Sequence, residues 1–160
     1  MSLQRQHYAA ALVWLVLMGL VYVYFESYSR PAASQLGHGE LRIPRAPDGH
    51  FYVDGSVNGT PVRFLIDTGA SSVSLSQALA QRIGLQGGRA AEFSTAGGTA
   101  SGEFFSDVSI RIANLHVDGL RVAVLPTMGA EALLGQNFLR HVDVLIRDDA
   151  LLLRARPPAP

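Results

Sequence analysis

The sequence lacks two residue types on which much enzyme chemistry depends. None of its 160 residues is cysteine, and all 13 basic residues are arginine, so lysine is absent as well. The chain therefore has no cysteine nucleophile, thiolate metal site or disulfide, and no serine–lysine pair or lysine Schiff base. The 13 acidic residues balance the arginines to a formal net charge of zero. This balance argues against a nucleic-acid-binding protein that relies on bulk positive charge.

Several well-known site motifs are also missing. The histidines do not show the His-x-x-x-His spacing of a metal site; they are His7, His38, His50, His116 and His141. The chain contains no Gly-x-Ser-x-Gly turn, no phosphate-binding Gly-x-x-x-x-Gly-Lys loop and no Gly-x-Gly-x-x-Gly turn. We therefore predict no metal, no cofactor and no nucleic-acid partner.

One long apolar run stands near the N-terminus. Residues 8–25 contain no charged side chain, and as a helix they would span about 27 Å, close to the thickness of a bilayer's hydrocarbon core. Aromatic rings, which favour the membrane interface, stand at both ends of the run. We predict a transmembrane anchor over 8–25 that follows a short cytoplasmic N-terminus, residues 1–7. The alternative is a cleaved signal peptide, although the small residues Ala32 and Ser34 lie far from the apolar run.

The charges beside this run predict its orientation. Arg5 and His7 precede it, whereas Glu26 and Arg30 follow it. Positively charged flanks stay in the cytoplasm. We therefore expect a single-pass protein of the inner (cytoplasmic) membrane, whose C-terminal part faces the periplasm or the cell exterior.

The rest of the chain has the pattern of one small β domain. Residues 26–48 contain scattered proline and glycine and are predicted to be a linker, and 157–160 are a proline-rich tail. Between them, 49–156 contains short apolar runs separated by turns, including an Asn58-Gly59 hairpin signal. A short helix is predicted over 77–83, closed by Gly84. The expected fold class is all-β with one or two short helices.

An aspartate ends one of these apolar runs. Phe64, Leu65 and Ile66 lead directly into Asp67, which is followed by Thr68-Gly69. A carboxylate at such a place is costly to bury unless hydrogen bonds satisfy it, and the Thr-Gly turn can supply them. An ordinary Asx turn at the end of a strand is the simpler alternative.

Two further motifs, together with the aspartate motif, carry a family resemblance. Gly97-Gly98 forms a predicted hairpin among small residues, and Leu133-Leu134-Gly135 follows about 65 residues after Asp67. With Leu65–Ala70, these motifs resemble the retropepsin family of aspartic proteases, in particular its single-domain, membrane-anchored bacterial members. The resemblance covers about residues 49–153.

The resemblance implies a closed β-barrel that works as a homodimer and cleaves peptide bonds as an endopeptidase. Asp67 of each copy would activate water, because the reaction needs one carboxylate as base and another as acid. Thr68 would lock the two loops together, and the Gly69 N–H would hold the carboxylate. The substrate, a peptide or unfolded protein, would contact residues of the motif, the hairpin and the later Leu-Leu-Gly segment: Ala70, Thr95, Ala96, Gly97, Gly98, Leu134 and Gly135.

Some positions depart from the viral pattern of the family. Ser71 and Ser72 stand where acidic residues often follow, and Gln136 stands where arginine often follows. An ion pair that braces the viral dimer is thus missing, and membrane anchoring could offset weak association by raising the local concentration. A non-catalytic, membrane-anchored peptide-binding module on the same fold is the alternative function.

Overall fold

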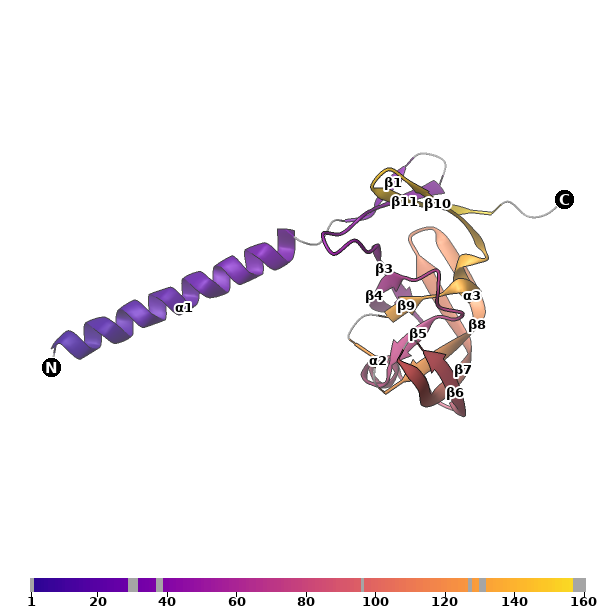
Figure 1. The fold of residues 1–160 in the computed structure, drawn as a ribbon, viewed down its shortest axis with the longest axis horizontal. Helices are drawn as coiled ribbons and strands as arrows, with labels where there is room; N and C mark the ends of the chain where they lie inside the picture. Colours follow the sequence, from indigo (N-terminus) through magenta and orange to yellow (C-terminus); the bar gives the residue numbers. More distant parts are fainter. Residues whose placement is uncertain are drawn as a thin grey trace. The chain divides into compact units, whose positions relative to one another are not determined.

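The protein is described from a computed structural model (Figure 1). The described residues are 2–28, 32–36, 39–95, 97–126, 128–129 and 132–156. The chain divides into two compact units, Met1–Pro31 and Ala32–Pro160. The predicted tail at 157–160 lies outside the described residues.

The first unit is one helix, α1, Ser2–Tyr28. Its described side chains, at position 8 and positions 11–25, are all exposed. Among the residues that the structure describes, no helix is long and apolar enough to cross a membrane.

The second unit is built mostly of strands. They are β1 Ser34–Leu36, β2 Glu40–Pro44, β3 Tyr52–Val57, β4 Thr60–Ile66, β5 Ser74–Ser76, β6 Arg89–Thr95, β7 Gly98–Ile112, β8 Leu115–Leu125, β9 Ala132–Leu134, β10 Val142–Arg147 and β11 Ala150–Ala155. Two short helices, α2 Gln77–Ile83 and α3 Gln136–Leu139, interrupt them. The prediction of an all-β domain with short helices is confirmed.

The larger sheet has seven strands in the order β3-β4-β9-β5-β8-β7-β6. Most pairs are antiparallel, but β4 runs parallel to β9 and β5 runs parallel to β8. An additional pairing joins β3 to β7. This pairing favours the closed barrel expected from the sequence, although closure itself stays a prediction.

Local sequence explains the turn that precedes the aspartate motif and the helix that follows it. Asn58 and Gly59 both have positive φ, 48° and 82°, as a tight two-residue hairpin turn requires. At α2, the Ser76 hydroxyl accepts a hydrogen bond from the Leu79 N–H, and Gly84 ends the helix at φ 77°. The predicted helix over 77–83 is therefore confirmed.

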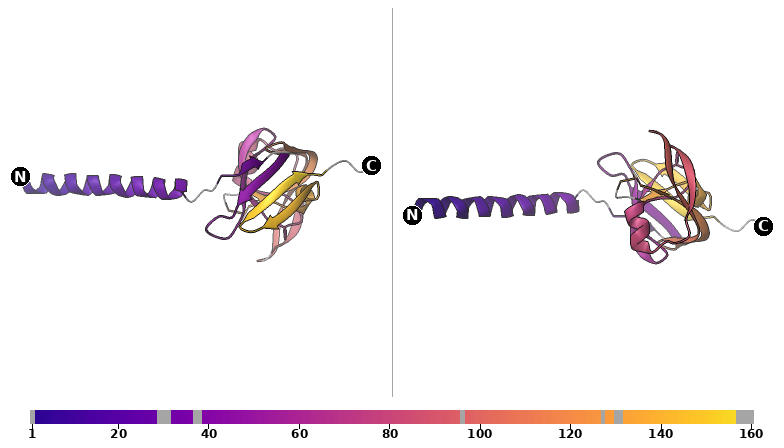
Figure 2. Two further views of the ribbon diagram at one scale, coloured as in Figure 1. Left: turned by 90° about the horizontal axis from the view of Figure 1, so that it is seen from above. Right: turned by 90° about the horizontal axis from the view of Figure 1, so that it is seen from below.

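The smaller sheet corrects the predicted linker. Its order is β1-β2-β11-β10, and Figure 2 shows β2 beside the yellow C-terminal strands. Leu41 pairs with Leu153 and Ile43 with Leu151, and these side chains are buried. The linker prediction is wrong for residues 34–36 and 40–44, which form β1 and β2 of this sheet. The alternation of Leu41 and Ile43 was masked by nearby glycine and proline, and the partner strand lies more than 100 residues away.

Candidate active site

Asp67 follows β4 directly and begins a tight loop. Its N–H donates to the Leu134 carbonyl at 3.2 Å, so the loop starts from the parallel β4–β9 pair. The Gly69 N–H donates to Asp67 Oδ1 at 2.8 Å. The Asp67 side chain is half-buried. A backbone N–H on one carboxylate oxygen fixes the orientation of the group and leaves the other oxygen free to face a ligand.

The segment that begins at Gly135 holds this loop in place through hydrogen bonds. The Gln136 N–H donates to the Ala70 carbonyl at 2.8 Å, and the Asn137 N–H donates to the Ser71 carbonyl at 3.1 Å. The Gln136 side-chain Nε2 also donates to the Thr68 carbonyl, at 2.8 Å. Gln136 thus supplies a neutral contact that supports the loop within one chain, and this contact was not predicted from the sequence.

Gly135 permits this close approach. A Cβ at this position would lie 2.3 Å from the Ser72 carbonyl oxygen and 2.8 Å from the Ala70 carbonyl oxygen. Such distances are too short for any side chain. Gly135 is buried, so its role is to let two backbone segments meet.

The Asn137 side chain extends the same brace. Its Oδ1 accepts from the Val73 N–H at 2.8 Å, and its Nδ2 donates to the Arg121 carbonyl at 2.7 Å. One amide therefore joins the end of the Asp67 loop to β8. The acceptor and a donor of this amide are thus both used on backbone groups, which ties the loop to β8.

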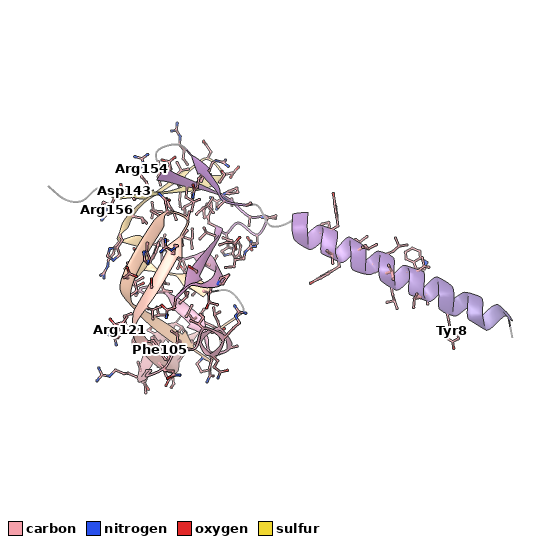
Figure 3. All side chains as sticks on the ribbon, turned by 180° about the vertical axis from the view of Figure 1, so that it is seen from behind. Tyr8, Phe105, Arg121, Asp143, Arg154 and Arg156 are labelled. Atoms are coloured by element: carbon pink, nitrogen blue, oxygen red, sulfur yellow. The ribbon has the colours of Figure 1, made fainter. Side chains whose placement is uncertain are left out.

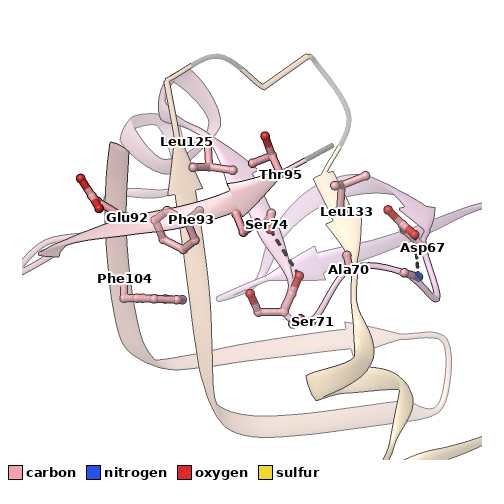
Figure 4. Close-up of a pocket in the computed structure, with 13 residues that line it drawn as sticks. Asp67, Ala70, Ser71, Ser74, Glu92, Phe93, Thr95, Phe104, Leu125 and Leu133 are labelled. Carbon is pink, nitrogen blue, oxygen red and sulfur yellow. Dashed lines mark hydrogen bonds between the residues drawn. The ribbon is translucent and has the colours of Figure 1, made fainter. Parts of the chain in front are cut away.

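A cavity of about 640 Å³ lies between the Asp67 loop and the β6–β7 hairpin. Asp67 and small residues of its loop form one side, and Phe93, Phe104, Leu125 and Leu133 supply apolar surface (Figure 4). The rings of Phe93 and Phe104 are 4.6 Å apart between centroids and inclined at 55°, a favourable aromatic arrangement. The cavity can hold an apolar side chain close to a carboxylate.

Two carboxylates line this cavity, those of Asp67 and Glu92. Figure 4 shows them at opposite ends of the cavity, with Phe93 and Ser74 between them. Glu92 therefore does not form a carboxylate pair with Asp67. One chain offers a single carboxylate at this place.

Several residues predicted for the site line the cavity, although their roles stay predictions. Asp67, Gly69, Ala70 and Thr95 line the cavity. Thr68 is exposed and does not line the cavity; its contact with a second copy stays a prediction.

Other predicted contacts differ. Gly97 and Gly98 are exposed at the hairpin turn and are not among the residues that line the cavity, whereas Leu134 and Gly135 are buried beneath the loop. Within one chain, Leu134 and Gly135 therefore support the Asp67 loop instead of lining the cavity. Ala96 lies outside the described residues.

The apolar wall of the cavity was not predicted from the sequence. Phe93 lies two residues before Thr95 on β6, and alternate residues of a strand share a face. That spacing could have assigned Phe93 to the cavity. Phe104 and Leu125 carried no such signal, because their approach depends on the pairing of β7 with β6 and β8. No group of three or more metal-ligand side chains occurs among the described residues.

Comparison with known proteins places this geometry in a family. Residues 53–141, more than half of the chain, match the family described as "gag-polyprotein putative aspartyl protease". The chain belongs to this family. The aspartyl protease match spans the Asp67 loop, the hairpin and the Gly135 segment that braces the loop.

Relatives and a solved structure agree with the family. The chain is 46% identical over 46 residues to an uncharacterized protein of Rickettsia prowazekii, covering 29% of this chain and 20% of that protein. It is 31% identical over 124 residues to an uncharacterized protein encoded in the cobV 5′ region of Sinorhizobium, covering 74% and 53%. The chain thus spans about half or less of the length of these relatives.

The fold is similar to the crystal structure of a retropepsin-like aspartic protease from Rickettsia conorii. The TM-score is 0.58 at 27% identity, over 72% of this chain and 89% of that chain. Family and fold together place the chain among the retropepsin-like aspartic proteases.

Proposed function

We propose that the protein is an aspartic endopeptidase whose nucleophilic water is activated by Asp67 of two copies of the chain. The observation that carries this proposal is the Asp67 carboxylate, which lines the cavity while the Gly69 N–H holds one of its oxygens at 2.8 Å. The chain's own cavity offers no second carboxylate close to Asp67, because Glu92 lies at its opposite end.

Two carboxylates are needed because the reaction moves two protons. One carboxylate accepts a proton from water, and the other, protonated, donates to the carbonyl oxygen of the scissile bond. Two carboxylates held so near each other share one proton, because the repulsion between like charges opposes ionisation of both. A two-fold axis that brings the two exposed Thr68 loops together supplies this arrangement.

The substrate in this proposal is an extended peptide or an unfolded segment. β6 is the edge strand of the seven-stranded sheet, and an extended peptide can add main-chain hydrogen bonds to such an edge. The apolar wall at Phe93, Phe104 and Leu133 favours an apolar side chain beside the scissile bond. Cleavage preference along the rest of the peptide follows from the subsites that the second copy adds.

The decisive experiment is cleavage of a peptide library by the full chain beside Asp67→Asn. Asp54→Asn is the matched control, because Asp54 is exposed on β3 and lines a different pocket. We expect Asp67→Asn to lose at least a thousandfold in rate and Asp54→Asn to keep the wild-type rate. With dilute enzyme the rate should rise faster than linearly with concentration.

A folded, dimeric protein that binds peptides and cuts none would favour the alternative, a peptide-binding module. In that case Asp67→Asn would leave peptide affinity within about threefold of wild type, since the carboxylate would have no reacting bond to serve.

We also propose that residues 8–25 hold the protein at the inner membrane with the protease domain on the outer side. The described side chains at 11–25 are uncharged and exposed, and Arg5 lies on the N-terminal flank. Extraction of membranes at alkaline pH tests the anchor: retention in the pellet supports it, whereas release into the supernatant contradicts it. Protection of the C-terminal domain from external protease in spheroplasts would contradict the orientation.

A further inference from the structure

The cavity beside Asp67 is lined by negative charge alone. Among its described lining residues, the charged ones are Asp67 and Glu92, and none is basic. Glu92 is exposed and forms no ion pair with a described residue. It lies at the end of the cavity opposite Asp67 (Figure 4). A cleft lined by charges of one sign favours ligands of the other sign, so this end of the cavity is suited to a positively charged group.

Two hydroxyl groups of the lining use their hydrogen within the chain. The Ser74 hydroxyl donates to the Ser72 carbonyl at 3.3 Å, and the Thr95 hydroxyl donates to the Gly98 carbonyl at 2.7 Å. A hydroxyl has one hydrogen to donate and two lone pairs that accept. Ser74 and Thr95 therefore offer acceptors, and not donors, to a group that enters the cavity. An acidic side chain finds neither a positive charge nor a donor from these residues.

The aromatic wall of the cavity is already covered by a cation of the chain itself. The Arg121 guanidinium lies over the Phe104 ring, 3.8 Å from its centroid, and the Phe93 ring stands 4.6 Å from that of Phe104. Arg121 is exposed at the periphery of the domain (Figure 3) and does not line the cavity. A second positive charge placed on this wall would be repelled by Arg121. The wall therefore takes an apolar side chain, and a cation is directed to Glu92.

The free edge of β6 explains how Phe93 and Glu92 line one cavity. They are consecutive on this strand, and consecutive side chains point to opposite faces. Both line the cavity, so the cavity reaches both faces of β6, which is the edge strand of its sheet. A peptide that pairs with this edge places its own successive side chains on the same two faces. A residue that packs against Phe93 is then adjacent in sequence to a residue that faces Glu92.

We propose that the cavity selects peptides in which an apolar residue is directly adjacent to a basic one, arginine or lysine. The apolar side chain packs against Phe93, and the basic side chain faces Glu92. This inference rests on the proposed function and deepens it, because it assigns a substrate class to the cavity that contains Asp67. The volume of about 640 Å³ lies within the range of pockets that hold ligands larger than one side chain.

The size of the effect follows from the exposure of Glu92. An ion pair between exposed groups changes an equilibrium by about fivefold at most. We therefore expect peptides with arginine at this position to be cleaved with about fivefold higher kcat/KM than matched neutral peptides. Because the Glu92 side chain is exposed, its replacement by glutamine does not disturb the packing of the domain.

Matched peptides test the charge preference. In peptides that the full chain cleaves in mild detergent, the residue on each side of the apolar one is replaced in turn by arginine, by citrulline, which is its neutral near-isostere, or by glutamate. The arginine-to-citrulline ratio of kcat/KM should be about 5 at one of these positions in the wild type. It should fall to within twofold of 1 in Glu92→Gln, and Glu92→Arg should prefer the glutamate peptide to the arginine peptide.

The control is Glu103→Gln, which removes an exposed carboxylate of the neighbouring strand β7 that does not line the cavity. It should keep the wild-type ratio. A ratio near 1 in the wild type, a ratio that Glu92→Gln leaves unchanged, or an equal change in Glu103→Gln would overturn the inference and leave the proposed function standing.

The same peptides separate this inference from the proposed function. If the wild type cuts none of them, the ratios are measured as affinities by fluorescence anisotropy. A Glu92-dependent preference for arginine in binding would then support the charge selection and refute the protease function. Binding without that preference, or no binding of these peptides, would overturn the charge selection as well.

Discussion

The close approach at Gly135 makes a quantitative prediction for the Gly135→Ala variant. Gly135 has φ −92° and ψ −176°, a conformation open to alanine, so the added methyl group causes no backbone strain of its own. Its Cβ would, however, lie 2.3 Å from the Ser72 carbonyl oxygen, and ordinary contact begins at 3.4 Å. The two backbone segments must separate by about 1 Å to admit it.

The expected cost is at the upper end for overpacking, about 3 kcal/mol. The atoms in the way belong to the backbone of Ala70 and Ser72, and backbone cannot rotate aside as a side chain can. For a domain of this size, 1 kcal/mol shifts the melting temperature by about 4 °C. Gly135→Ala should therefore melt about 12 °C below wild type.

The same displacement reaches Asp67. The hydrogen bond from the Gln136 N–H to the Ala70 carbonyl, 2.8 Å long, lies beside the added methyl group. The loop therefore cannot keep both its position and this hydrogen bond. We expect peptide cleavage to fall at least a hundredfold at a temperature where the variant is still folded, since misplacement of a reacting group by about 1 Å costs this much.

Thermal unfolding followed by circular dichroism, and cleavage kinetics well below the transition, are the two assays. Gly129→Ala is the control, because a Cβ there meets nothing within 4 Å and no positive φ opposes it. Its melting temperature should stay within about 2 °C of wild type. If Gly135→Ala melts together with Gly129→Ala, the close approach does not constrain the loop and the reasoning fails.

Three further changes test other parts of the structure. Asn137→Ala removes an amide that satisfies two backbone groups and should lower the free energy of unfolding by about 2 kcal/mol in denaturant titration; an unchanged midpoint would contradict the brace. Phe93→Ala removes an apolar wall of the cavity and should reduce kcat/KM about 10- to 100-fold for peptides with a large apolar residue at the scissile bond; an equal loss for peptides with a small residue there would argue against a direct contact. The pKa of Asp48 is lowered from its ordinary value of 3.8, chiefly because its carboxylate accepts a hydrogen bond from the His50 backbone N–H. Its folded-state pKa lies below the unfolded one, so its stabilising effect is present above about pH 4 and is lost as the pH falls through the folded value. Asp48→Asn should then lower the melting temperature slightly at pH 7, and this loss should shrink as the pH falls below about 4; a loss that grows at low pH would contradict the sign.

Much of the site could be predicted because its signals are local. The Asp67 turn, the Asn58-Gly59 hairpin and the helix capped by Ser76 each depend on residues a few positions apart. Local hydrogen bonds and φ preferences decide such features. The hairpin at Gly97-Gly98 belongs to the same class.

The rest depends on contacts between distant segments. β2 forms because Leu41 and Ile43 find Leu153 and Leu151, and nothing near residue 41 encodes that partner. The burial of Leu134 and Gly135 depends in the same way on β9 pairing with β4. Leu-Leu-Gly could be recognised as a motif, but its role as a support for the loop followed only from the position of Ser72.

The contacts that hold the Asp67 loop also bear on the absence of the ion pair that the viral members of the family use between their two copies. The Asp67 loop is held by backbone hydrogen bonds from Gln136 and Asn137 and by the neutral Gln136 side chain, all within one chain. Its conformation therefore does not depend on a charged contact with a second copy. In the proposed dimer, two formed loops would come together without having to be ordered, so little conformational entropy would oppose their association. In that dimer a small contact surface would suffice, particularly if the proposed membrane anchor raises the local concentration of the chain.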